Sequence, residues 1–563
     1  MKNIIYILVI ITLFMASACE NLDREIINTL SVNQVETSYD YSLNRLTSIY
    51  TNLPEGFMNI DGAMMASASD EAEHSIESSS VHKFNTGAWN AYDNPDNVWG
   101  SYYNGIRKAN LFLQNSNSID LDAYRLDPTT SSQAVYTQKL ADIKRWKYEA
   151  RFLRAFFYFE LVKRYGGIPL IKTPSSIDDA GLNVNRNSLA ECVQFITDEC
   201  DSAATNLPVT YTAADMGRVT KGAALSLKSR VLLFSASDLF NTTTWASGYA
   251  KPELISLAGD RTARWKAAAD AAKAVIDLAG TGYALASNYR SLFNTYNNSE
   301  IILTRRNSAS NGFEFSSFPI GFNLAQGGTT PSQNMVDAYE MTDGTTFDWS
   351  NPVHAANPYS NRDPRLGLSI IFNNSTYKLR TIECWTGGLD GKGIERATKT
   401  GYYMKKYVDE NLNITLNNKS VHSWILIRLA EIYLNYAEAL NEYSPGHADI
   451  KTYVDKVRAR AGIAMPGMAV GTQDEVREKI RNERRVELAF ENFRFWDLRR
   501  WMKAPAYLDV PLKGVIITKT GPSTFTYVPY DVETRTFDPK MYLYPIPYKE
   551  INIDNLLVQN PGW

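Results

Sequence analysis

The sequence is poor in cysteine, with four in 563 residues. Cys192 and Cys200 lie eight residues apart in a segment with helical spacing, which separates them by ~12 Å, too far for a disulfide bond. Cys384 is isolated, no pair has CxxC spacing, and no two of the five histidines have HxxxH spacing. The sequence therefore predicts three buried free thiols, no metal site and no cofactor.

An excess of positive charge is also absent. The chain has 58 lysines and arginines against 61 aspartates and glutamates, a formal net charge of −3. Because a nucleic-acid-binding protein needs clustered cations to neutralise phosphates, we expect no nucleic-acid partner.

Catalytic motifs are missing as well. The sequence contains no GxSxG, HExxH or calcium-loop pattern. The glycine-rich run Gly387–Gly393 lacks P-loop spacing and the flanking strand and helix of a dinucleotide-binding turn. These absences favour a binding protein over an enzyme.

A long apolar run occurs only at the N-terminus. Lys2 is followed by Ile4–Met15, twelve mostly apolar residues that are too few to span a bilayer, and then by small residues. This pattern is typical of a secretory signal peptide, here residues 1–18. Cys19 comes next and resembles the lipid-carrying first residue of bacterial lipoproteins, although leucine is usual where Ala16 stands. We therefore expect a lipid anchor on Cys19 instead of a spanning helix, and a plain signal peptide with a chance cysteine is the alternative.

Most of the remaining chain shows helical periodicity. Apolar residues recur every three or four positions from Phe152 to Val162, and Gly166 then predicts the end of that helix. Ser188 and Glu191 form the spacing of a capping box at the start of another helix. Further helices are predicted in residues 217–237, 264–279, 447–463 and 424–442, the last with a stripe of Leu426, Leu429, Tyr433, Tyr436 and Leu440.

These helices occur as neighbouring pairs, which is typical of tetratricopeptide-type helical hairpins with a degenerate consensus. The helical scaffold is predicted over about residues 37–52, 98–280 and 422–502. Two long regions break the pattern, residues 53–97 and 281–421, which are rich in Gly, Asn and Pro signals. Irregular insertions on a rigid scaffold commonly carry binding groups, so we expect the ligand there.

A stretch near the C-terminus, "RNERRVELAFENFRFWDLRRW", combines many arginines, acids and aromatic residues. On a helix, Glu483 and Glu487 share the apolar face with neighbouring hydrophobic residues, which is costly unless both are paired. Arg494, Arg499 and Arg500 follow and are predicted to reach back to them.

That reach requires a bend, for which Asn492 is suited because asparagine tolerates the left-handed conformation. A catalytic reading of the two acids is disfavoured. Glycosidase carboxylates lie on opposite sides of a sugar, and neighbouring arginines lower a carboxyl pKa instead of raising it. The stretch is predicted to be structural, an arginine–glutamate network that holds the last helices to the scaffold.

Several motifs together resemble the SusD/RagB family of outer-membrane lipoproteins over nearly the whole chain. The resemblance is carried by "EARFLRAFFYFELVKRYGGIPL", "IRLAEIYLNYAEALNE", "IRNERRVELAFENFRFWDLRRW" and the terminal "YLYPIPYKEINIDNLLVQNPGW", with support from "NMVDAYEMTDG" and "RDPRL". Two departures are small. Asn492 stands where glycine is commoner, and "INIDN" lacks a usual proline.

The resemblance implies a mainly α, SusD-like fold of four tetratricopeptide-like helical hairpins, with the irregular insertions forming the ligand side. It implies a single domain over residues 19–563, lipid-anchored in the outer membrane and facing the cell exterior. Such proteins are not enzymes and work with a SusC-like TonB-dependent transporter, to which they pass captured oligosaccharides. A fructan or another plant-type glycan is our expectation here, and peptide capture by a RagB-like protein on the same fold is the alternative.

Sugar binding needs aromatic faces together with acids, amides and arginines that bond hydroxyl groups. The first irregular region and the helix before it supply Asp70, Glu71, Trp89, Tyr92 and Asn44. The second region supplies Arg305, Arg306, Arg365 and Trp385. Other residues of these types are expected to be structural, namely the core residues Trp99 and Tyr102, and Arg362 and Arg365 if "RDPRL" serves the fold.

Overall fold

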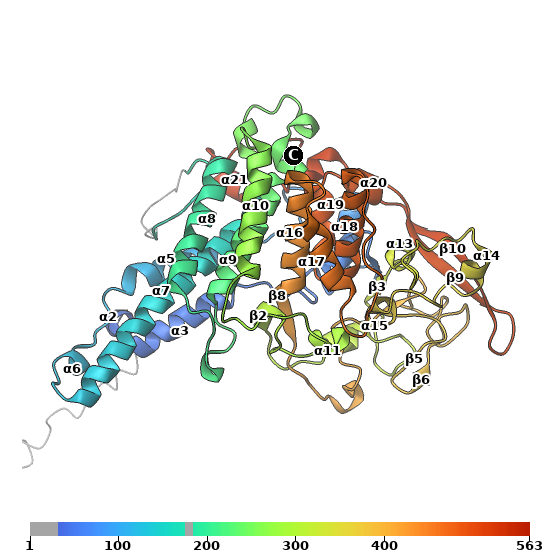
Figure 1. The fold of residues 1–563 in the computed structure, drawn as a ribbon, viewed down its shortest axis with the longest axis horizontal. Helices are drawn as coiled ribbons and strands as arrows, with labels where there is room; N and C mark the ends of the chain where they lie inside the picture. Colours follow the sequence, from blue (N-terminus) through green and yellow to red (C-terminus); the bar gives the residue numbers. More distant parts are fainter. Residues whose placement is uncertain (1–31, 175–183) are drawn as a thin grey trace, which may run out of the picture.

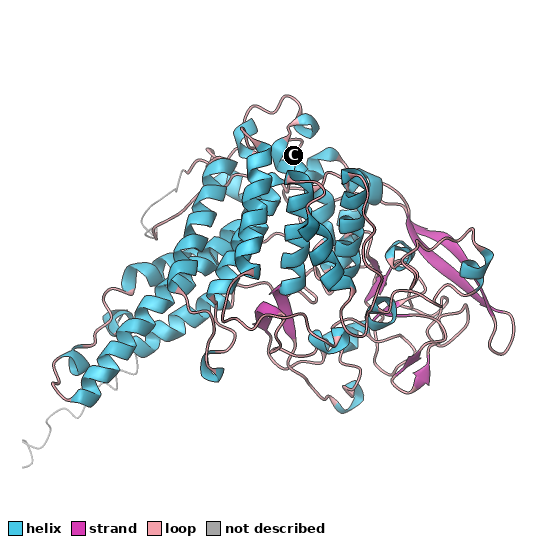
Figure 2. Cartoon of the chain, in the orientation of Figure 1, coloured by secondary structure: helices cyan, strands magenta, loops and turns pink. Residues whose placement is uncertain are grey.

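The computed structural model of the protein describes residues 32–174 and 184–563 (Figure 1). It is mainly helical, as the sequence predicts, and strands are few and short (Figure 2). The longer helices are α2 (Val32–Thr37), α3 (Tyr39–Tyr50), α5 (Trp99–Asn115), α7 (Thr130–Tyr165), α8 (Leu189–Asn206), α9 (Lys221–Ala236), α10 (Arg261–Ile276), α16 (Leu429–Tyr443), α17 (Ala448–Arg458), α18 (Gln473–Glu487) and α19 (Arg494–Arg500).

Helices that are neighbours in the sequence pack against one another. Helix α7 contacts α5 and α8, α9 contacts α8 and α10, and α16 contacts α10, α17 and α18. Figure 1 shows these helices standing side by side, with the yellow segments of the second irregular region gathered at one side of them. The helices thus form a scaffold with one side occupied by irregular chain.

Two helix boundaries match the sequence prediction. Helix α7 ends at Gly166, whose φ of 75° lies in the left-handed region that glycine adopts without strain. Helix α8 begins with a capping box, in which Ser188 accepts from the backbone N–H of Glu191 and the Glu191 carboxylate accepts from the backbone N–H of Ser188.

The predicted helix over residues 424–442 is shorter than expected. Its first part is the strand β8 (Ser423–Arg428), which pairs antiparallel with β2 (Ile301–Arg306). Leu426 therefore lies in a strand and outside the helical stripe. All six residues of β8 are buried, and a short apolar run that is buried on both faces cannot be assigned to helix or strand from periodicity alone.

The two irregular regions are joined by a short antiparallel ladder between β1 (Ala72–His74) and β3 (Thr329–Pro331). The other strands form separate pairs, and the chain also has short helices. The strands are β4 (Ile370–Ile371) with β7 (Tyr403–Met404), β5 (Thr376–Tyr377) with β6 (Arg380–Thr381), and β9 (Leu512–Lys519) with β10 (Phe525–Glu533). The short helices are α4 (His82–Thr86), α6 (Asp122–Arg125), α11 (Tyr289–Leu292), α12 (Gly312–Ser317), α13 (Gln333–Ala338), α14 (Pro352–Ala356), α15 (Arg365–Ser369), α20 (Ala504–Leu508) and α21 (Tyr548–Ile553).

The arginine–glutamate network exists, but its arginines are not the predicted ones. Glu487 Oε1 lies 2.7 Å from Arg428 and 2.6 Å from Arg460, and its Oε2 lies 2.9 Å from Arg365. Glu483 pairs with Arg365 at 2.6 Å and with Arg458 at 2.8 Å. These arginines come from β8, α15 and the end of α17, which lie beside α18 only in the folded chain.

The three arginines that follow α18 bind elsewhere. Arg494 pairs with Asp70 at 2.7 Å, and Arg500 pairs with Glu438 and Asp497. Arg499 donates to backbone oxygens. The bend before α19 is present, since Asn492 has a φ of 63°. It directs the arginines toward the first irregular region and α16 and away from α18.

Cys192, Cys200 and Cys384 are buried and unbridged, as predicted. Among the described residues, no helix combines the length and apolar character needed to cross a membrane. The predicted signal peptide and Cys19 lie outside the described residues.

Candidate functional site

Asp70 and Glu71 lie in the core. Neither carboxylate is exposed beyond 1%. Burial by itself would raise the pKa of Asp70, but ion pairs with Arg485 and Arg494 outweigh it and lower the pKa to about 2. Glu71 accepts from the backbone N–H of Phe490, and burial raises its pKa to about 8. These two acids attach the first irregular region to α18 and to the chain that follows it, so in this structure they do not face a ligand.

Trp89 is also buried, with 2% of its surface exposed. Its ring packs against Phe84, Tyr544 and Trp563, with centroids 5.1, 5.0 and 4.7 Å away. A sugar platform needs a free ring face, so the expectation that Trp89 is such a platform is wrong for this structure. Sequence alone could not show that the chain terminus folds over this ring.

The two arginines of "RDPRL" are structural. This is the alternative that the sequence analysis gave to ligand binding by Arg365. Arg365 is fully buried and pairs with Asp363 as well as with the glutamates of α18. Arg362 donates to the backbone oxygens of Val336, Tyr339 and Pro358. Because every one of these contacts is internal, Arg365 does not present a donor to a ligand.

Tyr92 is the most exposed aromatic candidate, with 74% of its surface open. It stacks on Tyr548 of α21, which is 44% exposed, with ring centroids 4.2 Å apart and planes inclined by 27°. The outer face of Tyr92 remains open. This pair, termed the Tyr92 pair below, is an aromatic surface of the kind that stacks on sugar rings.

The remaining candidates lie at separate places. Asn44 is exposed on α3. Arg305 of β2 pairs with Glu55 at 2.9 Å and donates to the backbone just after α3, and Arg306 lies over the ring of Tyr296. Trp385 is half-buried, stacked on Phe525 with Lys519 above its ring.

The exposed candidates therefore do not form one site. Arg305 of β2 contacts the end of α3, but Figure 1 shows α21 and the β9–β10 hairpin on other sides of the molecule, away from these two elements. The convergence expected from the sequence fails, because residues that are close in an irregular segment point to different sides of the scaffold.

Both irregular regions contribute to several clefts, and one of these, of about 490 Å³, is lined by the two regions alone. One wall is Ser75–Ser78, the segment that follows β1, and the other is Lys392–Lys399. We name this the insertion cleft. It is lined by hydroxyl groups, carboxylates and cations, so it offers both donors and acceptors.

The first wall is fixed by the strand pairing beneath it. In the β1–β3 ladder Glu73 faces Thr330, and Ser75, the first residue after β1, donates its backbone N–H to the oxygen of Gly328 at 2.9 Å. Gly327 and Gly328 both have positive φ, 79° and 47°, where a side chain would be strained. Their lack of a Cβ allows the chain to turn closely against the cleft.

Charges of both signs meet at the insertion cleft. Lys399 lies 3.2 Å from Glu77, which lines the cleft, and 3.6 Å from Glu73, which is buried next to it. Lys392 lies 4.4 Å above the ring of Tyr530, and Arg396 donates to the side chain of Gln326. The side chain of Glu77 is 82% exposed, so its carboxylate can accept from a bound molecule.

Next to the cleft, β1 holds buried polar groups without hydrogen-bond partners among the described residues. Both carboxylate oxygens of Glu73 and both ring nitrogens of His74 are in this state. Burial raises the pKa of Glu73 to about 8 and lowers the pKa of His74 to about 4. Unusual pKa values beside a cleft are a common mark of a functional site.

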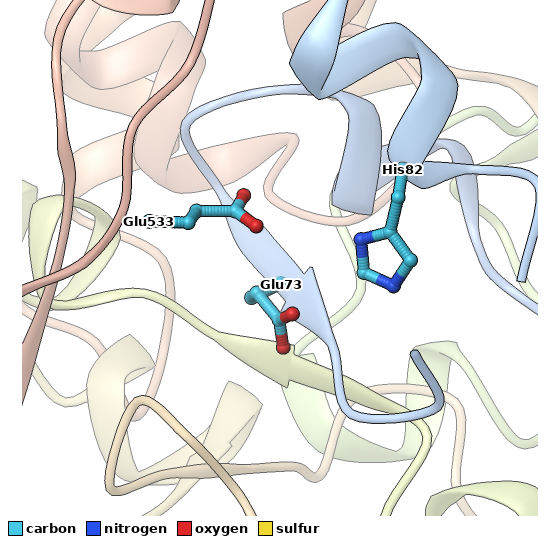
Figure 3. A group of neighbouring side chains, drawn as sticks. All are labelled: Glu73, His82 and Glu533. Carbon is cyan, nitrogen blue, oxygen red and sulfur yellow. The ribbon is translucent and has the colours of Figure 1, made fainter. Parts of the chain in front are cut away.

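Figure 3 shows that Glu73 lies beside His82 of α4 and Glu533 of β10. Sequence reasoning did not select these residues. Glu73 and His82 lie nine residues apart in the first irregular region, but Glu533 is brought in from the far end of the chain, which no local pattern could reveal.

Comparison with known protein families gives two matches. The SusD family profile matches residues 299–563. A second profile, described as starch-binding and associating with the outer membrane, matches residues 24–233. Together they span most of the chain, including both walls of the insertion cleft.

Individual relatives share about a quarter of their residues with this chain. SusD-like protein P25 of Formosa agariphila is 23% identical over 497 residues, which cover 82% of this chain and 78% of that protein. A SusD-like protein of Bacteroides ovatus is 24% identical over 485 residues, covering 82% and 77%.

Solved structures share the fold. A SusD-like protein of Bacteroides fragilis superposes with a TM-score of 0.78 at 26% identity, covering 95% of this chain and 99% of that one. A laminarin-binding SusD-like protein superposes with a TM-score of 0.59 at 21% identity, covering 94% and 100%.

Proposed function

The chain belongs to the SusD family of carbohydrate-binding proteins associated with the outer membrane, and from this premise we propose that it captures oligosaccharides at the cell surface for import. In this proposal residues 19–563 form one domain held to the membrane by lipid on Cys19. The captured sugar passes to a SusC-like TonB-dependent transporter. The protein itself carries out no chemistry on the sugar.

The observation that carries the proposal is the insertion cleft, because it lies where the two irregular regions meet. A sugar presents many hydroxyl groups, each able to donate and accept. Glu77 supplies an acceptor, Lys399 and Arg396 supply donors, and Ser78 supplies both. Their mixed charge suits a neutral oligosaccharide better than a strongly acidic one.

The Tyr92 pair is proposed as a second contact for a longer chain. Its free ring face offers an aromatic surface, and no described residue that lines the cleft is aromatic. The two surfaces are separate, so they make separable contributions to binding of a polymer.

Isothermal titration against a panel of oligosaccharides and polymers tests the proposal. The panel includes fructans, starch fragments and laminarin, since a structural relative is described as laminarin-binding, and a peptide digest is run beside it. Heat from one glycan class supports the proposal. If only the peptides give heat, the family assignment stands, but the proposed ligand is a peptide and not a glycan.

Two variants then assign the site. Glu77→Ala combined with Arg396→Ala is expected to weaken binding of the identified glycan by at least about tenfold, which corresponds to ~1.4 kcal/mol. Lys251→Ala, on a surface away from the cleft with a half-exposed side chain, is the matched control. Unchanged affinity in the double variant would remove the insertion cleft from the proposal.

Absence of turnover is tested with the same samples. Incubation of the protein with each polymer is expected to release no reducing sugar. Release that scales with protein concentration would contradict a pure binding role.

A further inference from the structure

Beneath the insertion cleft, three potential metal ligands converge from distant parts of the sequence. Glu73, His82 and Glu533 each place a ligand atom within 4.8 Å of the others. They come from β1, α4 and the last residue of β10, and Figure 3 shows their side chains directed into a shared space.

Within the part of the chain that the structure describes, Glu73 has one long ion pair and no hydrogen bond to satisfy its buried carboxylate. Its side chain is fully buried, and neither oxygen has a hydrogen-bond partner among the described residues. Its closest cation is Lys399, at 3.6 Å, beyond hydrogen-bonding distance. Buried carboxylates are normally paired, hydrogen-bonded or bound to a metal.

His82 is held in the orientation of a metal ligand. Its Nε2 lies 3.1 Å from the backbone oxygen of Ile76. Because a carbonyl oxygen only accepts, Nε2 must carry the proton, and the Nδ1 lone pair is left free. Figure 3 shows that nitrogen turned toward the two glutamates. A backbone carbonyl that fixes the tautomer in this way is the usual second partner of a metal-binding histidine.

Glu533 keeps one oxygen available. Its Oε1 accepts from Arg535 at 2.7 Å and from Asn85 at 3.2 Å. These contacts fix the carboxylate, and Oε2 has no protein donor among the described residues. One imidazole nitrogen and carboxylate oxygens from two glutamates are therefore available as ligands for a single metal ion.

We propose that Glu73, His82 and Glu533 bind a divalent transition-metal ion, with Zn²⁺ as the preferred ion. An imidazole ligand disfavours Ca²⁺ and Mg²⁺, which take oxygen ligands. Two ligands of one zinc ion lie at most ~4.2 Å apart, twice a bond of ~2.1 Å. The present spacing therefore needs a contraction of less than ~1 Å, which side-chain rotation can supply.

Lys399 is the competitor for this site. It contacts both the buried Glu73, at 3.6 Å, and the exposed Glu77, at 3.2 Å. A bound metal ion would repel it, and Glu77 offers it an alternative partner. Removing the lysine charge is therefore expected to strengthen metal binding, a result that adventitious binding at the surface would not produce.

Titration of the purified protein, without a histidine tag, with Zn²⁺ and separately with Ca²⁺ tests the proposal. One Zn²⁺ per chain is expected, with no heat from Ca²⁺. Glu73→Gln and His82→Gln are each expected to weaken Zn²⁺ binding by at least about tenfold. Lys399→Met is expected to strengthen it several-fold.

The controls are His354→Gln and Glu253→Gln, which change a histidine and a glutamate outside the cluster and should leave Zn²⁺ affinity unchanged. Circular dichroism verifies that each variant is folded. Equal Zn²⁺ affinity in wild type, Glu73→Gln and His82→Gln would overturn the site, and so would weaker binding in Lys399→Met or a preference for Ca²⁺. None of these results depends on glycan binding.

Discussion

At the scale of single residues, the buried ion pairs around α18 make several side chains depend on one another, because a buried charge that loses its partner is costly. Glu487 has no exposed surface and contacts three arginines. Burial raises a carboxyl pKa, but here Arg460, Arg428 and Arg365 outweigh it and hold the pKa of Glu487 far below its ordinary value. The carboxylate is therefore charged at any pH the cell experiences.

Glu487→Ala is expected to destabilise the protein by about 3–5 kcal/mol, because it leaves buried arginines without their counter-charge. Urea unfolding measures the change. Glu478→Ala on the same helix is the control, since that side chain is 59% exposed, and its effect should stay within about 0.5 kcal/mol. Full stability of Glu487→Ala would contradict the network.

Trp89→Ala is expected to lower stability by about 3–5 kcal/mol, since it opens a cavity among three aromatic rings. Thermal unfolding gives the result. Tyr92→Ala, in the same loop but exposed, should change stability little. An unchanged melting temperature together with a loss of glycan binding would contradict the assignment of Trp89 to the core and would make it a sugar-binding residue.

Glu71 predicts a pH dependence of stability. Its pKa is raised by burial from 4.5 to about 8, so its neutral form favours the folded state. The contribution is complete below about pH 4.5 and is lost as the pH rises through about 8. Between pH 5 and pH 8, wild type should lose at least ~1 kcal/mol of stability relative to Glu71→Gln. Parallel pH curves for the two proteins would show that Glu71 does not titrate in this way.

At the scale of elements, helix ends decide where the chain turns. Gly166 ends α7 with φ 75° and ψ −138°, and a Cβ there would meet the backbone oxygen of Leu254. This close approach lets the segment after α7 pass beside Leu254, whose backbone oxygen accepts from the N–H of Gly167.

Gly166→Ala is expected to destabilise the protein by at least ~1 kcal/mol, through backbone strain and the collision with Leu254. Gly100→Ala is the matched control. It lies in the first turn of α5 with open space around its Cβ position, so it should stabilise slightly, by up to ~1 kcal/mol. Chemical unfolding measures the free energy of unfolding of both variants. Equal changes would show that position 166 does not require glycine more than position 100 does.

At the scale of the whole molecule, a helical scaffold carries two irregular regions that meet at the β1–β3 ladder. Packing of neighbouring helices makes the scaffold rigid, while the irregular regions contribute polar groups and the buried cluster beneath them. The proposed lipid attachment at Cys19 is far along the chain from the cleft and can be changed by itself, whereas the proposed metal site shares Lys399 with the cleft.

Cys19→Ser is expected to release the protein from the membrane fraction, because a lipid on Cys19 is the proposed attachment. Cell fractionation followed by immunoblotting measures it. The purified variant should bind glycan with wild-type affinity, since the cleft residues are far along the chain from residue 19. A variant that stays in the membrane fraction would point to another mode of attachment.

The sequence by itself determined the family, the mainly helical fold, the buried cysteines and several helix ends. Each of these depends on local spacing, such as the stripe from Phe152 to Val162 or the capping box of Ser188, which neighbouring residues in the chain specify.

The tertiary structure alone decided which polar and aromatic side chains are accessible. Trp89 and Tyr92 look alike in the sequence, yet Trp563 covers the first and leaves the second open. Glu487 needed charged partners, but which arginines supply them depends on β8 and α15. Glu73 meets Glu533 across most of the chain length. Burial and pairing are set by contacts between distant segments, and local periodicity carries no information about those contacts.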